Sequence, residues 1–294
     1  MNEDTDSESS LLVVIFDTSL TQDVILNDEI KLSECLEIII TFVNAHLMLK
    51  SNNKIAMITC DSRSCAFIYP DEEQEPGQLR QTDGQYELFT HVEKTIRKNV
   101  QKFLVKTLEG EITRSDSLFG AACSIALCYI HRLENEKSLG DKMNSRILII
   151  TGCGNSGDQY IPCMNTFFTA QKQNVTIDVC SLQKEITLLQ QACDITNGVF
   201  LKLPQLSSLL QYLLWVFLPD PTVRKKLVVP PPVSVDYRPF CFCHHELIDI
   251  GFVCSVCLAI YCKLSPICTT CEVVFKLKAP MKAVKVKKKK MIKS

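Results

Sequence analysis

The chain lacks any long uninterrupted apolar segment. The longest candidate, Leu206 to Leu218, is broken by Ser207, Ser208 and Gln211 and is shorter than the roughly 20 residues of a membrane-spanning helix. The first residues, Met1-Asn-Glu-Asp, are acidic and do not form an apolar signal segment. We therefore expect no membrane span, and a reducing compartment in which disulfides are rare.

Motifs of common enzymes are also missing. No lysine follows a glycine run as in a P-loop, and no Gly-x-Ser-x-Gly turn presents a nucleophile. Of five histidines, His46, His91 and His131 fall in helical patterns that are typical of surface or core positions. Because no nucleophile is paired with a base, we expect a protein that is not an enzyme.

The charge is balanced only on average. The net charge is −1, but residues 276–294 carry nine lysines and no acid, so residues 1–275 sum to −1 − 9 = −10. An acidic body is not typical of a non-specific nucleic-acid binder. The lysine-rich end indicates a nuclear-localisation signal or a polyanion-binding patch, and direct DNA contact stays open.

Apolar patterns predict strands that alternate with helices. Leu11–Phe16 is a continuous apolar run, typical of a strand buried on both faces, whereas apolar residues at intervals of three and four over 32–49 predict a helix. The other expected strands are Lys54–Cys60, Cys65–Tyr69, Arg146–Thr151, Val175–Cys180 and Val199–Leu203. The other expected helices are 90–107, 117–133, one from about Pro162, 184–196 and 205–218. This order predicts an α/β fold: a doubly wound, mostly parallel six-stranded sheet with helices on both faces.

The composition divides the chain into five parts. We expect an acidic disordered N-terminus (1–9), the α/β domain (10–218), a proline-rich linker (219–239), a zinc-binding module (240–275) and a basic disordered tail (276–294). The linker limits follow from Pro219-Asp-Pro221 and Pro230-Pro-Pro232, which stiffen an extended chain.

Seven of the sixteen cysteines lie close together near the C-terminus. Four of them, Cys254, Cys257, Cys268 and Cys271, form two Cys-x-x-Cys pairs, and four sulfurs close the tetrahedral sphere of a structural Zn²⁺. The other nine cysteines are scattered through apolar stretches, as reduced thiols usually are. The remaining cluster members, Cys241, Cys243 and Cys262, could form a second, cross-braced site with His244 or His245, or pack as small apolar groups.

A polar loop follows the first strand. Asp17-Thr-Ser19-Leu-Thr21 resembles the magnesium-binding loop of von Willebrand A domains, and the expected order of elements also resembles that fold. The family's hydroxyl from a second loop could come from Thr113-Arg-Ser115-Asp-Ser117. Gly152 stands where the family has a carboxylate, so we expect a vestigial site without working Mg²⁺ binding.

The loop after Thr151 has a second possible interpretation. Gly152-Cys-Gly154-Asn-Ser-Gly157 matches the dinucleotide fingerprint, and Asp178 lies 21 residues beyond Gly157. The match is weak because the helix is delayed to about Pro162 and the strand is fourth in order, not first.

The whole arrangement resembles one family. An α/β domain, a proline linker and the cysteine motifs together resemble the subunit 3 family of TFIIH. Members of this family are the smaller of the two von Willebrand A and zinc-finger subunits in the TFIIH core. The motifs are Cys241-Phe-Cys-His, Gly251-Phe-Val-Cys-Ser-Val-Cys-Leu258 and Ser265-Pro-Ile-Cys-Thr-Thr-Cys271, with Leu11-Leu-Val-Val-Ile and Ala126-Leu-Cys-Tyr-Ile-His131 in the α/β domain. The resemblance implies a non-catalytic nuclear scaffold in RNA polymerase II initiation and nucleotide excision repair. Its implied partners are the larger von Willebrand A and zinc-binding subunit and, through it, the helicase subunits.

Two alternatives remain. The cross-braced cysteines also fit a RING-type ubiquitin ligase module, which would transfer ubiquitin from an E2. The Asp17 loop also fits a magnesium-dependent von Willebrand A module, in which Asp17→Ala would abolish ligand binding.

Overall fold

The computed structural model describes residues 9–21, 32–71, 84–108, 117–137, 143–152, 159–182, 185–231, 234–244 and 246–275. These fall in two compact units, Met1–Tyr237 and Arg238–Ser294, which we describe separately. Of the two ends expected to be disordered, only Ser9 lies within the described residues, where it begins the first strand. The domain limits drawn from composition stay a prediction.

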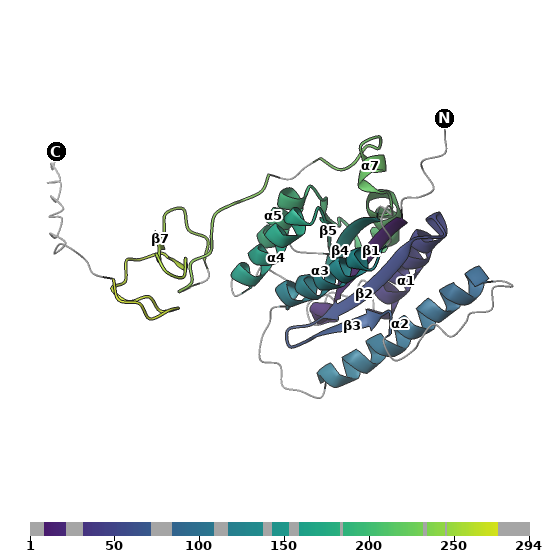
Figure 1. Ribbon diagram of the computed structural model, residues 1–294, viewed down its shortest axis with the longest axis horizontal. Coiled ribbons are helices and arrows are strands. Elements are labelled where there is room, and N and C mark those ends of the chain that lie inside the picture. Colours follow the sequence, from purple (N-terminus) through teal and green to yellow (C-terminus); the bar gives the residue numbers. More distant parts are fainter. Residues whose placement is uncertain are drawn as a thin grey trace, which may run out of the picture. The chain divides into compact units, whose positions relative to one another are not determined.

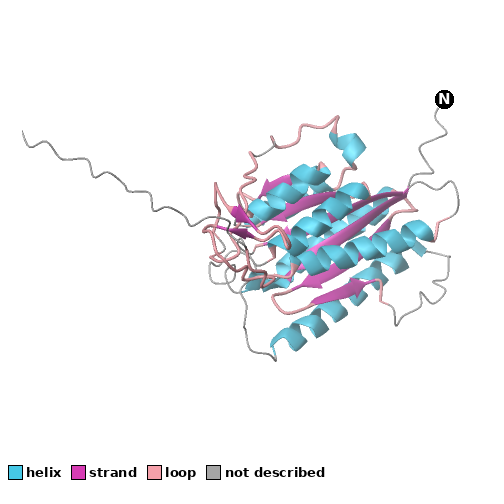
Figure 2. Ribbon diagram, turned by 60° about the vertical axis from the view of Figure 1, so that its left-hand side comes forward, coloured by secondary structure: helices cyan, strands magenta, loops and turns pink. Residues whose placement is uncertain are grey.

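The first unit is built on a six-stranded sheet (Figure 2). Its strands are β1 (Ser9–Asp17), β2 (Lys54–Cys60), β3 (Cys65–Tyr69), β4 (Met143–Thr151), β5 (Thr176–Ser181) and β6 (Phe200–Lys202), in the spatial order β3-β2-β1-β4-β5-β6. Only the β2–β3 pair is antiparallel. The apolar residues of β1 are all buried because β1 is central and covered on both faces, as its continuous apolar run predicts. This confirms the predicted fold class.

Helices cover both faces of the sheet (Figure 1). One face carries α1 (Leu32–Leu49), α2 (Gly84–Leu108) and the final helix, which consists of η3 (Leu206–Ser208), α6 (Leu209–Tyr212) and the π-helical turn η4 (Leu213–Phe217). The other face carries α3 (Phe119–Asn135), α4 (Tyr160–Lys172) and α5 (Thr187–Thr196). Helix α4 begins two residues before Pro162, which we expected to be the first helical residue.

Helix α1 is a core helix despite its composition. Among the described residues it is the one helix long and apolar enough to cross a membrane, with a mean hydropathy of 1.5. Seven of its residues between Cys35 and His46 are buried, and the apolar ones belong to the core on one face of the sheet. Burial against the sheet accounts for its apolar side.

Two buried arginines close the end of the final helix. Arg146 of β4 donates hydrogen bonds to the carbonyls of Phe217, Leu218 and Pro219 at 2.6, 2.8 and 3.0 Å. The carbonyls of Phe217 and Leu218 are among those that a helix C-terminus leaves without an internal partner. Arg224, in the short helix α7 (Pro221–Arg224), makes a two-pronged ion pair with Asp178 of β5 at 2.7 and 2.6 Å. The segment expected as a linker therefore begins with a helix that packs on the domain.

The final helix is not covered on every side. Leu206, Leu209 and Leu213 are buried in the core, whereas Trp215 is 70% exposed. The apolar residues of this helix extend around most of its circumference, a pattern that predicts burial on most sides. Within the first unit, the described residues bury the side that carries these three leucines and leave Trp215 exposed.

The second unit contains little regular structure. Strands β7 (Phe252–Val253) and β8 (Ile260–Tyr261) form an antiparallel hairpin, and two isolated bridges, Phe240↔Leu247 and Ile267↔Val274, close two further turns. Its buried apolar cluster consists of Cys254, Ala259, Tyr261 and Cys268. Such a core is too small to hold a chain this short without a further stabilising element.

Candidate metal centre

The second unit brings the four cysteines of the two Cys-x-x-Cys pairs together. The sulfurs of Cys254, Cys257, Cys268 and Cys271 all lie within 4.8 Å of one another. Cys254 and Cys271 are 3.7 Å apart and Cys257 and Cys268 are 3.5 Å apart, measured between sulfurs. Two sulfurs bound at about 2.3 Å to one tetrahedral zinc lie about 3.8 Å apart, so the cage has the size of a zinc site.

The backbone holds both pairs in the same kind of turn. The amide of Leu258 donates to the Cys254 carbonyl at 3.0 Å, and the amide of Glu272 donates to the Cys268 carbonyl at 2.9 Å. Leu258 and Glu272 both have positive φ, 62° and 60°. Non-glycine residues seldom adopt this conformation, and both turns have it at the residue directly after the second cysteine, so the two turns share one backbone geometry.

Hydrogen bonds favour the thiolate form of Cys268. Burial alone would raise its pKa, but hydrogen bonds from the Tyr261 hydroxyl and the amides of Cys271 and Thr270 outweigh burial and lower the pKa to about 5. The Tyr261 oxygen lies 3.1 Å from the Cys268 sulfur. A thiolate is the form that binds a metal, so these donors suit a ligand position.

A second group of side chains that could hold a metal ion lies in the same unit. The ligand atoms of Cys241, Cys243, His244 and Cys262 are also within 4.8 Å of one another. The sequence left the choice between two neighbouring histidines open, and the structure brings His244 to the cysteines; His245 lies outside the described residues.

The Asp17 loop is closed by its own hydrogen bonds. Asp17 ends β1, is fully buried, and accepts hydrogen bonds from the hydroxyls of Ser19 and Ser117 at 2.6 Å each and of Thr151 at 2.7 Å. The Ser19 amide donates to the same carboxylate at 3.1 Å. Neutral donors thus satisfy this buried carboxylate, as a buried charge requires.

The residues expected to form a magnesium site are brought together only in part. Ser117 supplies the hydroxyl from the second loop, while Thr113, Ser115 and the Thr21 side chain lie outside what the structure describes. Gly152 follows β4 directly, at the place where the family has a carboxylate. Among the described groups, one carboxylate faces three hydroxyls, which is a weak ligand set for a divalent cation.

Asp178, the acidic residue of the possible dinucleotide motif, is already paired inside the fold. Asp178 is buried, and both of its oxygens are engaged by Arg224, while Oδ1 also accepts the Val199 amide at 2.9 Å. It is used inside the fold and does not face a ribose. The loop 153–158 itself lies outside the described residues.

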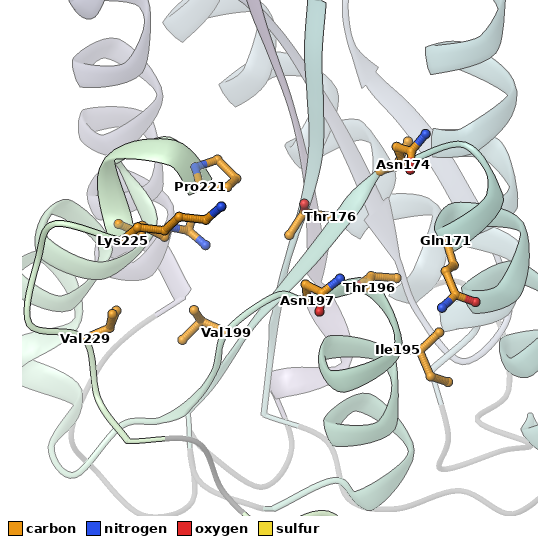
Figure 3. A pocket seen from close by; sticks show the side chains of 12 residues that line it. Gln171, Asn174, Thr176, Ile195, Thr196, Asn197, Val199, Pro221, Lys225 and Val229 are labelled. Atoms are coloured by element: carbon orange, nitrogen blue, oxygen red, sulfur yellow. The ribbon is translucent and has the colours of Figure 1, made fainter.

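A pocket of about 600 Å³ lies at the opposite edge of the sheet, at the start of β5 (Figure 3). Figure 3 shows Pro221, Lys225 and Val229 on one side of it and Gln171 and Ile195 on the other. Its charged lining residues are Lys225 and Arg224, and Arg224 is paired with Asp178. The lining therefore offers no acid and base pair for catalysis.

These features define a class of protein: an α/β domain in which the Asp17 loop is closed by its own hydrogen bonds, joined to a small module with two clusters of side chains that could hold metal ions. The chain matches the family model "Transcription factor Tfb4" over residues 9–272, which includes all eight clustered ligands. The chain belongs to this Tfb4 family.

Relatives match over most of the chain. It is 37% identical to "General transcription and DNA repair factor IIH subunit tfb4" of Schizosaccharomyces pombe, covering 94% of this chain and 92% of the relative. It is 40% identical to "General transcription factor IIH subunit 3" of Dictyostelium discoideum, covering 87% of this chain and 71% of the relative. Among solved structures, the N-terminal domain of TFIIH p34 has a TM-score of 0.62 and 30% identity, and the match covers 72% of this chain and 99% of that domain.

Proposed function

We propose that the chain is a non-catalytic scaffold subunit of the general transcription and DNA repair factor TFIIH. The observation that carries this proposal is the family match over residues 9–272, which spans both units. Relatives that match over most of their length are named as subunits of that factor. The chain acts in the nucleus through protein contacts, in transcription by RNA polymerase II and in nucleotide excision repair.

The geometry of the α/β domain supports a non-enzymatic role. The polar group at the carboxyl edge of the sheet, where such folds place their ligands, is Asp17 with its three hydroxyl donors. All three hydroxyls of that group donate to the carboxylate, so the loop stabilises the fold. In this proposal the domain acts through protein contacts on its surface.

Zinc bound by Cys254, Cys257, Cys268 and Cys271 stabilises the second unit in this proposal. Four thiolates leave no open coordination position, so the ion is structural. A purified chain should contain at least one zinc, and Cys254→Ser/Cys257→Ser should lose it together with the fold of the module. Cys128→Ser, which replaces an exposed cysteine of α3, is the matched control. Less than one zinc per wild-type chain would contradict the assignment.

The partners follow from the same family membership. We infer contact with the larger von Willebrand A and zinc-binding subunit of TFIIH and, through it, with the helicase subunits. A tagged chain should recover these subunits from nuclear extract, and Cys128→Ser should recover the same amount. Recovery of the tagged chain without any of them would overturn the functional proposal.

The ubiquitin ligase alternative is tested with the same purified protein. Ubiquitin transfer with a panel of E2 enzymes, lost in Cys254→Ser/Cys257→Ser, would favour that alternative. We expect no transfer above the level seen with the E2 enzymes alone.

A further inference from the structure

The second unit is built from three equivalent hairpins. They are closed by the pairs Phe240↔Leu247 (hairpin 1), Val253↔Ile260 (hairpin 2) and Ile267↔Val274 (hairpin 3), each seven residues apart. In each hairpin, the amide directly after the first paired residue donates to the carbonyl five residues on, always at 2.9 Å. These bonds are Cys241 to Glu246, Cys254 to Ala259 and Cys268 to Val273.

The equivalence identifies two ligand positions of hairpin 1. In hairpins 2 and 3 the first ligand, Cys254 or Cys268, is followed by a second ligand three residues on. In hairpin 1 the residue three after Cys241 is His244. Hairpin 1 is therefore a Cys-x-x-His turn of the same construction as the two Cys-x-x-Cys turns.

The distances in this cluster fit a tetrahedral ion. The His244 Nδ1 lies 3.9 Å from the Cys241 sulfur and 3.3 Å from the Cys262 sulfur. The Cys243 and Cys262 sulfurs are 3.3 Å apart. Ligands at zinc–sulfur and zinc–nitrogen distances of about 2.3 and 2.0 Å are separated by roughly 3.5–3.8 Å, close to all three values.

The position of Cys262 connects the two clusters. It follows β8 directly, and the Phe242 amide of hairpin 1 donates to the Ile260 carbonyl in β8 at 2.8 Å. Along the chain, Cys241, Cys243 and His244 come first, then Cys254 and Cys257 of the other cluster, then Cys262, and finally Cys268 and Cys271. The ligands of the two clusters thus alternate, and neither cluster can be removed as a separate segment.

We propose that Cys241, Cys243, His244 and Cys262 bind a second Zn²⁺, cross-braced with the ion of the four-cysteine cluster. With so few buried apolar residues in this unit, metal binding supplies folding energy that a core would otherwise provide. The second ion ties hairpin 1 to β8, and the first ties hairpin 2 to hairpin 3. This inference concerns metal content and is independent of assembly with TFIIH.

The test counts metal in the full-length chain. Protein purified under reducing conditions, analysed by elemental analysis and native mass spectrometry, should contain two zinc ions per chain. Cys262→Ser and His244→Ala should each contain one, while the control Cys128→Ser should keep two. One zinc in the wild type, with Cys243 and Cys262 as free thiols or as a disulfide, would overturn the proposal, as would two zinc ions in Cys262→Ser.

A substitution that restores a ligand guards against simple misfolding of the variants. His244→Cys replaces nitrogen by a fourth sulfur and should keep two ions. With Co²⁺ in place of zinc, thiolate-to-metal absorption should rise from that of seven thiolates to that of eight. If His244→Cys holds one ion, or if its cobalt absorption equals that of the wild type, His244 is not a ligand.

Discussion

His46 in α1 should make the α/β domain sensitive to mild acid. Its side chain is fully buried, and neither ring nitrogen has a hydrogen-bond partner of normal geometry among the described residues. Burial lowers the pKa of His46 from 6.5 to about 4, assisted by the nearby Arg146 guanidinium. Asp220 and the carbonyls of Lys54 and Ser10 act in the opposite direction but do not outweigh it.

The sign and size of the effect follow from this pKa. Between pH 6.5 and 4, the histidine is protonated in the unfolded chain and neutral in the folded one, so unfolding takes up a proton. The contribution of His46 to stability is complete above pH 6.5 and is lost as the pH falls toward 4. Lowering the pH from 7.5 to 5.0 should cost about 2 kcal/mol from this one residue.

The substitution His46→Leu isolates that contribution. Leucine is similar in volume and has no proton to bind, so the variant should lose about 2 kcal/mol less than the wild type over this pH change. The free energy of unfolding is measured at both pH values by urea denaturation of the full chain. Far-UV circular dichroism follows the unfolding of the α/β domain, which contains the long helices of the described residues.

Two controls make the comparison decisive. His46→Gln has a polar side chain without a titrating group and should show the same reduced pH dependence as His46→Leu. His131→Gln removes an exposed histidine from α3 without touching the core. If His46→Leu and His46→Gln both keep the full pH dependence of the wild type, the reasoning is wrong.

Three further results are expected. Arg224→Ala should lower the free energy of unfolding, measured by urea denaturation, by about 3–5 kcal/mol because it leaves the Asp178 carboxylate buried without its partner. Substitution of the exposed neighbour, Lys225→Ala, should change it little, and a loss below about 1 kcal/mol in Arg224→Ala would refute the prediction. Millimolar Mg²⁺ should raise the melting temperature of the wild type by less than about 1 °C, and a larger rise that Asp17→Asn abolishes would show a working site. Trp215→Ala should lower the free energy of unfolding by less than about 1 kcal/mol, because the side chain is 70% exposed. Unfolding is followed by circular dichroism, and a larger loss would mean that the side chain is covered in solution.

Local patterns predicted the elements of the α/β domain well. The strands Lys54–Cys60 and Cys65–Tyr69 and the helix 32–49 have the limits that their periodicity indicates. The final helix shows the limit of such patterns. Its π-helical turn and the exposure of Trp215 depend on which neighbours pack against each side.

Long-range contacts accounted for what the patterns missed. Helix α7 lies in a stretch with a composition typical of a linker, and its Arg224 is held by Asp178, 46 residues away. The spacing of Asp178 from Gly157 matches that of the acidic residue in a dinucleotide fingerprint. Only the packing of α7 on β5 shows that its charge is already paired.

The fold class and the four-cysteine cluster could be predicted from the residue pattern, because both depend on short-range spacing: apolar periodicity for the sheet and helices, and a two-residue gap for each cysteine pair. How side chains far apart in the chain combine depends on the folded arrangement. Cys262 joins Cys241 across 21 residues because hairpin 1 hydrogen-bonds to β8, and Asp17 meets Ser117 and Thr151 because their segments meet at one edge of the sheet. The sequence named most of the candidates for both groups, but the choice of His244 and of the Ser117 and Thr151 hydroxyls depends on contacts that form only when the chain folds.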